Sequence, residues 1–209
     1  GLDVMTTCAT SHAIMCNTAQ DMERDPVYAS TVNNLVARTS KVEFTGEIQS
    51  WHLLHYLVEE IGLDKIRDAV KNPLKMNIAG YYGPDMQREG ACAGDDPFMP
   101  TYMEQLIEAL GGTPIDYDSK CMSVGSTSML TLEDSSLAMT AAVLSDAIQS
   151  GADLVVSACT VSHVNLDSYQ SKAGRVSGKN TKVPVCHLSE IVAFALGFYP
   201  DRLAQLRTR

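Results

Sequence analysis

The spacing of hydrophobic and polar residues changes character at about residue 74. Beyond it, short apolar runs alternate with amphipathic segments of helical period, a pattern typical of strands alternating with helices. The expected strands are 75–82, 114–117, 153–158 and 183–186, and the expected helices are 100–110, 132–149, 162–171 and 190–198. Strands joined by helices of this length pair in parallel through right-handed crossovers. The pattern therefore predicts an α/β fold, a parallel sheet with flanking helices.

The first third of the chain has a different pattern. After an apolar strand at 2–6, helical periodicity predicts helices at 12–24, 26–38 and 47–60 and a short helical turn at 63–70, with no strand between residues 12 and 72. Asp25-Pro26 supports the second helix, because Asp is a good N-cap and Pro suits the first helical position. His52 and His55 share a face of the third helix, and without a partnering ligand at a suitable spacing they are interpreted as packing residues.

A cysteine turn occurs twice. In the stretch Gly151–Gln170, Cys159 closes a buried strand just before a helix that opens near Ser162, and Cys159-Thr-Val-Ser-His163 repeats Cys8-Ala-Thr-Ser-His12. A thiol beside a helix N-terminus favours its thiolate form. The turns after parallel strands meet at one edge of the sheet. Gly83-Pro84, Cys121-Met122 and Cys159 to His163 are therefore expected to share a crevice, with Cys121 facing Cys159.

Charge and composition exclude several classes of function. The net charge of −9 argues against nucleic acid as a partner. The basic residues Lys172, Arg175, Lys179 and Lys182 are interpreted as a solvated loop. No apolar run approaches the ~20 residues that cross a bilayer, so no membrane span is expected. Six widely spaced cysteines without an export signal indicate a reducing, cytoplasmic compartment and free thiols or metal ligands.

Short motifs spread along the chain match a known family. They are Tyr81-Tyr82-Gly83, Asp95-Asp96-Pro97, the run Leu106 to Gly111, Cys121, Met129-Leu130-Thr131, and Ala158-Cys159 followed by His163, Asn165, Leu166 and Asp167. In these motifs the chain resembles the B subunit of heterodisulfide reductase, of the CCG or cysteine-rich domain family. The resemblance implies that residues 1–15 end a first cysteine-rich module whose remainder is absent, that 16–72 form a helical connection, and that 73–209 form a second module.

The resemblance also implies a cofactor. Each module of the family carries a Cys, a Cys-Cys-Gly and a Cys-x-x-Cys, and a complete set holds a non-cubane 4Fe–4S cluster through soft thiolate ligands. Cys8, Cys121 and Cys159 stand at these ligand positions. The family cysteines at four other positions are replaced, by Ser11, Pro84, Met122 and Ser162.

Three hypotheses follow from the retained and replaced positions. In the first, the chain is a subunit of a heterodisulfide reductase-like oxidoreductase complex and passes electrons to a disulfide or a neighbouring redox centre through an iron–sulfur site. In the second, it is a cluster-free scaffold that docks the other subunits of such a complex. In the third, Cys121, Cys159 and His163 hold a smaller metal ion such as zinc. The other thiols, Cys16, Cys92 and Cys186, match no ligand position and are assigned to packing, with Cys92 expected to be the most exposed of the three.

Overall fold

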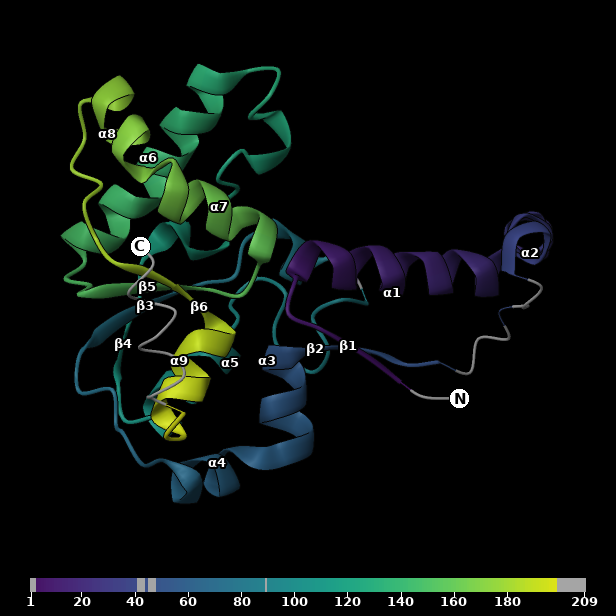
Figure 1. Cartoon of the computed structure of the whole chain (residues 1–209), viewed down its shortest axis with the longest axis horizontal. Coiled ribbons are helices and arrows are strands. Elements are labelled where there is room, and N and C mark those ends of the chain that lie inside the picture. The colour runs from purple at the N-terminus through teal and green to yellow at the C-terminus, as the bar shows by residue number, and fades with distance from the viewer. Residues whose placement is uncertain (1–2, 41–43, 45–47, 89, 199–209) are drawn as a thin grey trace.

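The computed structural model describes residues 3–40, 44, 48–88 and 90–198 (Figure 1). In this part of the chain, four parallel strands form the main sheet in the order β4-β3-β5-β6. They are β3 (Asn77–Tyr81), β4 (Thr113–Ile115), β5 (Leu154–Ser157) and β6 (Val185–His187). The sheet confirms the predicted α/β fold and the parallel pairing.

Helices cover both faces of the sheet (Figure 1). One face packs against α5 (Tyr102–Ala109) and α9 (Leu188–Ala195), whose apolar residues form one core with Ile78, Leu154 and Val156. The other face packs against α6 (Glu133–Gln149) and α7 (Thr160–Ser168), which form a second core with Ala79, Tyr81 and Val155. Successive residues of β3 thus enter opposite cores, as the alternation of a strand requires.

Helix α5 lies unusually close to β3. Its predicted stripe, Met103, Leu106, Ile107 and Leu110, is fully buried. A Cβ atom on Gly80 would lie 2.3 Å from Met103 Cγ, so only glycine permits this approach.

The first part of the chain forms an arm and a second, smaller sheet. Helices α1 (Ala9–Arg24) and α2 (Pro26–Ser40) project from the α/β body (Figure 1). Beneath α1, β1 (Val4–Thr6) pairs in parallel with β2 (Ser50–His52). The chain then continues through α3 (Leu53–His55), a π-helical segment (Tyr56–Gly62) and α4 (Leu63–Ala69).

The predicted helix at 47–60 is therefore wrong in its first half, as is the expectation of no strand between 12 and 72. Glu47 lies outside the described residues, Ser50–His52 are extended, and helical backbone begins at Leu53. The helical spacing of Trp51, Leu54 and Val58 masked the strand, whose pairing partner lies more than forty residues away. Tertiary pairing overrides local periodicity in so short an element.

The predicted helix at 162–171 is two helices. Helix α7 begins directly after Cys159, and α8 (Gln170–Ser177) follows and ends at Gly178, whose φ of 68° is left-handed. Lys172 and Arg175 lie on α8, so the interpretation of the basic stretch as a loop holds only for Lys179 and Lys182. In the described part of the chain, no helix is both long and apolar enough to cross a membrane.

Candidate functional site at two cysteine turns

The two cysteine turns predicted from the sequence have the same geometry. Cys8 follows β1 and is the N-cap of α1, while Cys159 follows β5 and is the N-cap of α7. Their backbones are equally extended, with φ/ψ of −118°/115° and −129°/120°. The N–H of His12 donates to the Cys8 carbonyl, and the N–H of His163 donates to the Cys159 carbonyl. The repeated sequence is thus a repeated strand–cysteine–helix unit.

The two turns also contact each other. The Thr10 hydroxyl, in the first turn of α1, lies 3.4 Å from Cys159 Sγ. In return, the Cys8 thiol is hydrogen-bonded by the side chain of Thr160 and the backbone of Val161, in the first turn of α7. Both thiols are buried, at 8% and 1% exposure. The structure therefore places them where two helix N-termini meet.

This junction changes the acidity of Cys8. Burial acts to raise the pKa of its thiol, but hydrogen bonds from Thr160, Ser11 and Val161 outweigh it and lower the pKa to about 7. The helix N-termini favour the same anion.

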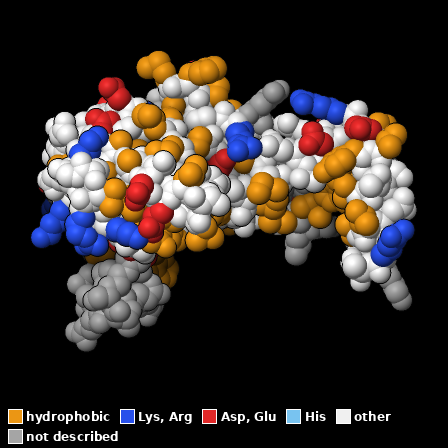
Figure 2. Space-filling model, turned by 90° about the horizontal axis from the view of Figure 1, so that it is seen from above, with side chains coloured by type: hydrophobic (Ala, Val, Ile, Leu, Met, Phe, Trp, Pro, Cys, Tyr) orange, Lys and Arg blue, Asp and Glu red, His pale blue; other side chains and the backbone are white. Residues whose placement is uncertain are grey.

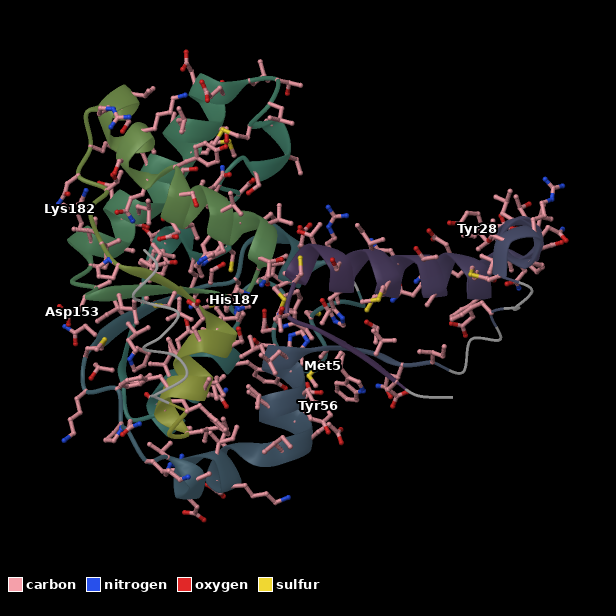
Figure 3. The ribbon with its side chains drawn as sticks, in the orientation of Figure 1. Met5, Tyr28, Tyr56, Asp153, Lys182 and His187 are labelled. Atoms are coloured by element: carbon pink, nitrogen blue, oxygen red, sulfur yellow. The ribbon has the colours of Figure 1, made fainter. Side chains whose placement is uncertain are left out.

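Two histidines at the ends of other strands contact backbone carbonyls of the two cysteine turns. His52, the last residue of β2, lies 2.8 Å through Nε2 from the carbonyl oxygen of Ala158, directly before Cys159. His187, the last residue of β6, lies 2.9 Å through Nε2 from the carbonyl oxygen of Thr7, directly before Cys8. Figure 3 labels His187 where β6 meets α9, on the side of the body that faces the arm.

His52 also belongs to a cluster of buried imidazoles. The rings of His12, His52 and His55 lie 5.7–5.9 Å apart, and each residue is at most 3% exposed. Burial, followed by the neighbouring His55, lowers the pKa of His52 to about 3, and burial followed by His12 lowers the pKa of His55 to about 4. His52 and His55 are packing residues, as predicted, but His52 also joins the two repeats, which the sequence interpretation missed. The shared His-Leu at 52–53 and 187–188, after each short strand, is the signal that could have revealed it.

Tyr81 lies among the turns that carry Gly83, Met122 and Ser162. Its hydroxyl donates to the Met122 carbonyl at 2.8 Å and is also hydrogen-bonded by the Ser162 side chain. It lies 3.1 Å from the point that a Cβ on Gly83, the neighbour of Pro84, would occupy. The residue is fully buried, and that burial raises the pKa of the phenol well above its usual value. An aromatic side chain thus fills the space between the three turns, a role that the sequence did not reveal.

Pro84 and Ser11 take ordinary structural roles. Pro84 opens a short 3₁₀ turn (Pro84–Gln87) after Gly83, whose φ is 73°. The next residue, Asp85, accepts a 2.5 Å hydrogen bond from Thr10, which ties the first cysteine turn to this loop. Ser11 contributes both its backbone and its hydroxyl to the Cys8 thiol.

Cys121 has different neighbours from Cys159. It ends the 3₁₀ turn Asp118–Cys121, beside Lys120, whose ammonium pairs with Glu104 at 3.0 Å. Burial, helped by the nearby carboxylates of Glu104 and Asp95, raises the pKa of the Cys121 thiol to about 11, against the opposing charge of Lys120. Cys121 therefore stays protonated at neutral pH, unlike Cys8.

Among the described residues, no group of three or more His, Cys, Asp or Glu side chains is placed to hold a metal ion. The zinc site of Cys121, Cys159 and His163 stays a prediction; the His163 ring lies 5.9 Å from that of His187. Of the thiols assigned to packing, Cys16 lies 3.6 Å from His12 Nε2, and Cys16, Cys92 and Cys186 are all partly buried.

An apolar groove runs beside the second cysteine turn. It has a volume of about 350 Å³ and is lined by Ser126, Met129, Thr160, Val161, Val164, Asn165 and Tyr169. Val161 and Val164, on the outer face of α7, are 41% and 48% exposed. Met122 and Leu130, which are close in sequence to the groove residues Ser126 and Met129, are 58% and 97% exposed. Figure 2 looks down on the molecule from above and shows hydrophobic side chains exposed between the charged ones.

Comparison with known proteins gives relatives along nearly the whole chain, although no family model matches. The chain is 28% identical over 204 residues to the B subunit of the ferredoxin:CoB-CoM heterodisulfide reductase of Methanosarcina mazei, covering 96% of this chain and 68% of that protein. It is 27% identical over 198 residues to the 8-methylmenaquinol:fumarate reductase membrane anchor subunit of Wolinella succinogenes, covering 94% and 68%. A protein of Archaeoglobus profundus named for its likeness to the heterodisulfide reductase B subunit is 25% identical over 217 residues, covering 98% and 70%.

A solved structure supports the fold. A hypothetical protein from Helicobacter pylori matches 86% of this chain with a TM-score of 0.65 at 13% identity, and this chain spans about a third, 32%, of that protein. At this identity the likeness concerns the fold alone. The sequence relatives go beyond the fold: at 25–28% identity over nearly the whole chain, they include heterodisulfide reductase B subunits and a B-like protein.

Proposed function

We propose that this chain is a cluster-free subunit that docks partner subunits within a cytoplasmic, heterodisulfide reductase-like complex. The observation that carries the proposal is the absence of a thiol at Pro84, Met122 and Ser162, three positions where the family has cysteines. The three turns that carry these residues lie close together, because the Tyr81 hydroxyl contacts Met122 and Ser162 and lies beside Gly83.

The residues present do not fit the family's iron–sulfur cluster. Of the second module's ligand positions only Cys121 and Cys159 keep a thiol, and proline has no atom that can bind iron. Electron transfer through a cluster, the first hypothesis from the sequence, is therefore the weaker candidate.

The docking half of the proposal rests on the groove beside α7. Val161 and Val164 are apolar, exposed and on one helix face, and Met129 and Tyr169 line the space next to them. Contiguous exposed apolar residues at a partly hollow surface mark protein interaction sites. The occupant we propose is an apolar segment of another subunit of the same complex.

The first test is the metal content of the protein purified anaerobically with its complex. We expect the iron, acid-labile sulfide and visible absorbance of the complex to be the same with the wild-type subunit and with a Cys121→Ala, Cys159→Ala variant. Stoichiometric iron and sulfide that disappear in a Cys121→Ala, Cys159→Ala variant would overturn the cluster-free half of the proposal.

The second test concerns assembly. The Cys121→Ala, Cys159→Ala variant should still assemble, whereas Val161→Asp with Val164→Asp should not. Val176→Asp is the matched control, because Val176 is also on a helix and is 46% exposed but lies outside the groove. If the variant with Val161→Asp and Val164→Asp assembled as well as Val176→Asp, the proposal that the groove docks a partner subunit would be refuted.

A further inference from the structure

The histidines that end β2 and β6 occupy matching places in the two repeats. In the β1–β2 pair, His52 lies opposite Thr6, two residues before Cys8. In the β5–β6 pair, His187 lies opposite Ser157, two residues before Cys159. Each histidine is the N-cap of the helix that follows it. The two are therefore equivalent by position, and their contacts can be compared atom by atom.

The hydrogen bonds fix the tautomer of both rings. His52 Nδ1 accepts from the Leu54 N–H at 3.1 Å, so the ring proton is on Nε2 and is donated to the Ala158 carbonyl. His187 Nδ1 accepts from the Ser189 N–H at 3.3 Å, so its Nε2 donates to the Thr7 carbonyl. A neutral imidazole has one donor and one acceptor, and both are used here. Neither ring has a nitrogen left for a metal ion.

The bonds cross between the repeats. His52 belongs to the repeat of Cys8 but holds the carbonyl before Cys159, while His187 belongs to the repeat of Cys159 but holds the carbonyl before Cys8. The contacts of Thr10 with Cys159 and of Thr160 with Cys8 cross in the same way. Each cysteine turn is thus held on one side by its own helix and on the other by the opposite repeat.

We propose that His52 and His187 are positioning residues, each of which holds the cysteine turn of the opposite repeat and so limits the reactivity of that repeat's thiol. His52 is fully buried and His187 is 7% exposed, so water cannot readily replace either bond. When a buried carbonyl loses its partner, its turn opens more often, and an opened turn exposes the thiol that follows. The proposal concerns the junction of the repeats and does not depend on the docking function.

Two substitutions separate the roles of each ring. Asparagine keeps an acceptor near the position of Nδ1, and it caps helices well, but it is too short to reach the opposite carbonyl. Glutamine keeps a donor near the position of Nε2 and loses the cap. His52→Asn therefore breaks the crossing bond alone, and His52→Gln keeps it.

The readout is the rate at which N-ethylmaleimide modifies each thiol, resolved by mass spectrometry of the peptides. In His52→Asn we expect Cys159 to react roughly five- to tenfold faster, the factor that one lost buried hydrogen bond gives, with Cys8 changed much less. His187→Asn should do the reverse, and His52→Gln should stay within about twofold of the wild type. The two Asn variants are matched controls for each other, and Cys92 reports general unfolding.

Three outcomes would overturn the proposal. One is a His52→Asn variant in which Cys8 and Cys159 accelerate equally. Another is a His52→Gln variant that behaves like His52→Asn. The third needs no variant and applies even if the substitutions prevent folding: nitrogen-15 spectra of the wild-type histidines should show the Nε2–H tautomer for His52 and His187, and the Nδ1–H tautomer would contradict the crossing bonds.

Discussion

Lowering the pH from 7 to 5 should destabilise the fold through its buried imidazoles. His52 faces the rings of His12 and His55, and repulsion between protonated His52 and protonated His187 also lowers the pKa of His52. His55 also packs against the ring of Tyr102, and Cys16 lies beside His12. Burial is the largest cause that lowers the pKa of each of the four histidines, so all are neutral in the native protein at pH 7.

The magnitude follows from the difference between native and unfolded pKa values. His52 titrates at about 3 and His55 at about 4 in the native state, against 6.5 for a free side chain. Below pH 6.5 the unfolded chain binds protons that the native chain does not, so stability falls as the pH falls. At pH 5, about 1.5 units below the pKa of the unfolded side chain, each of these two histidines lowers the free energy of unfolding by about 2 kcal/mol. Together they lower it by about 4 kcal/mol. His12 and His187 act in the same direction.

The assay is urea unfolding at pH 7 and pH 5. A loss of about 4 kcal/mol would be a large part of the 5–15 kcal/mol typical of a folded domain. The N–H groups of Met99 and Phe98 lower the pKa of Asp96 from a usual value of 3.8, so the effect of this carboxylate on stability comes below pH 5. The variant His52→Gln, His55→Gln should start less stable but lose about 4 kcal/mol less. A wild-type loss under about 1 kcal/mol, or an unchanged pH slope in the variant, would refute the reasoning.

Three further predictions concern single residues. Gly80→Ala should destabilise the fold by about 1–3 kcal/mol in urea unfolding, because its Cβ would overlap Met103; an unchanged midpoint would contradict the close approach of α5. Tyr81→Phe should cost about 1–3 kcal/mol by leaving the Met122 carbonyl unpaired, and a stability equal to the wild type would show that this hydrogen bond is not formed. The alkylation rate of Cys8 should be half-maximal near pH 7, and a midpoint at pH 9 or above would exclude the hydrogen bonds assigned to its thiol.

The periodic parts of the fold could be predicted from the sequence, whereas the short elements could not. The stripe of α5 and the apolar run of β5 are set by local patterns, and both are present as expected. Strand β2 has only three residues and depends on pairing with β1. Helix α8 contains Gly174 and has few apolar residues, so its pattern resembles a loop. Elements stabilised by distant partners leave little trace in their own sequence.

The candidate site likewise combines features that a local sequence pattern predicts with contacts that depend on distant residues. The repeat of Cys8 and Cys159 is a local pattern, and it correctly predicted two equivalent turns. The crossing bond from His52 to Ala158 joins residues 106 positions apart and ends on a backbone carbonyl, which every residue possesses. A sequence cannot indicate which carbonyl a histidine will meet until the strand register is known.

The position of the Tyr81 side chain follows from that register. Gly80 faces α5, where any side chain would overlap Met103. Alternation along β3 then turns Tyr81 to the opposite face, toward the second core and the turn of Cys159. A tyrosine directly after that glycine, at the end of the strand, extends its hydroxyl to Met122 and Ser162. The same strand geometry that lets α5 pack closely thus delivers the side chain that fills the space between the cysteine turns, and the two features should be lost together if the register of β3 shifts by one residue.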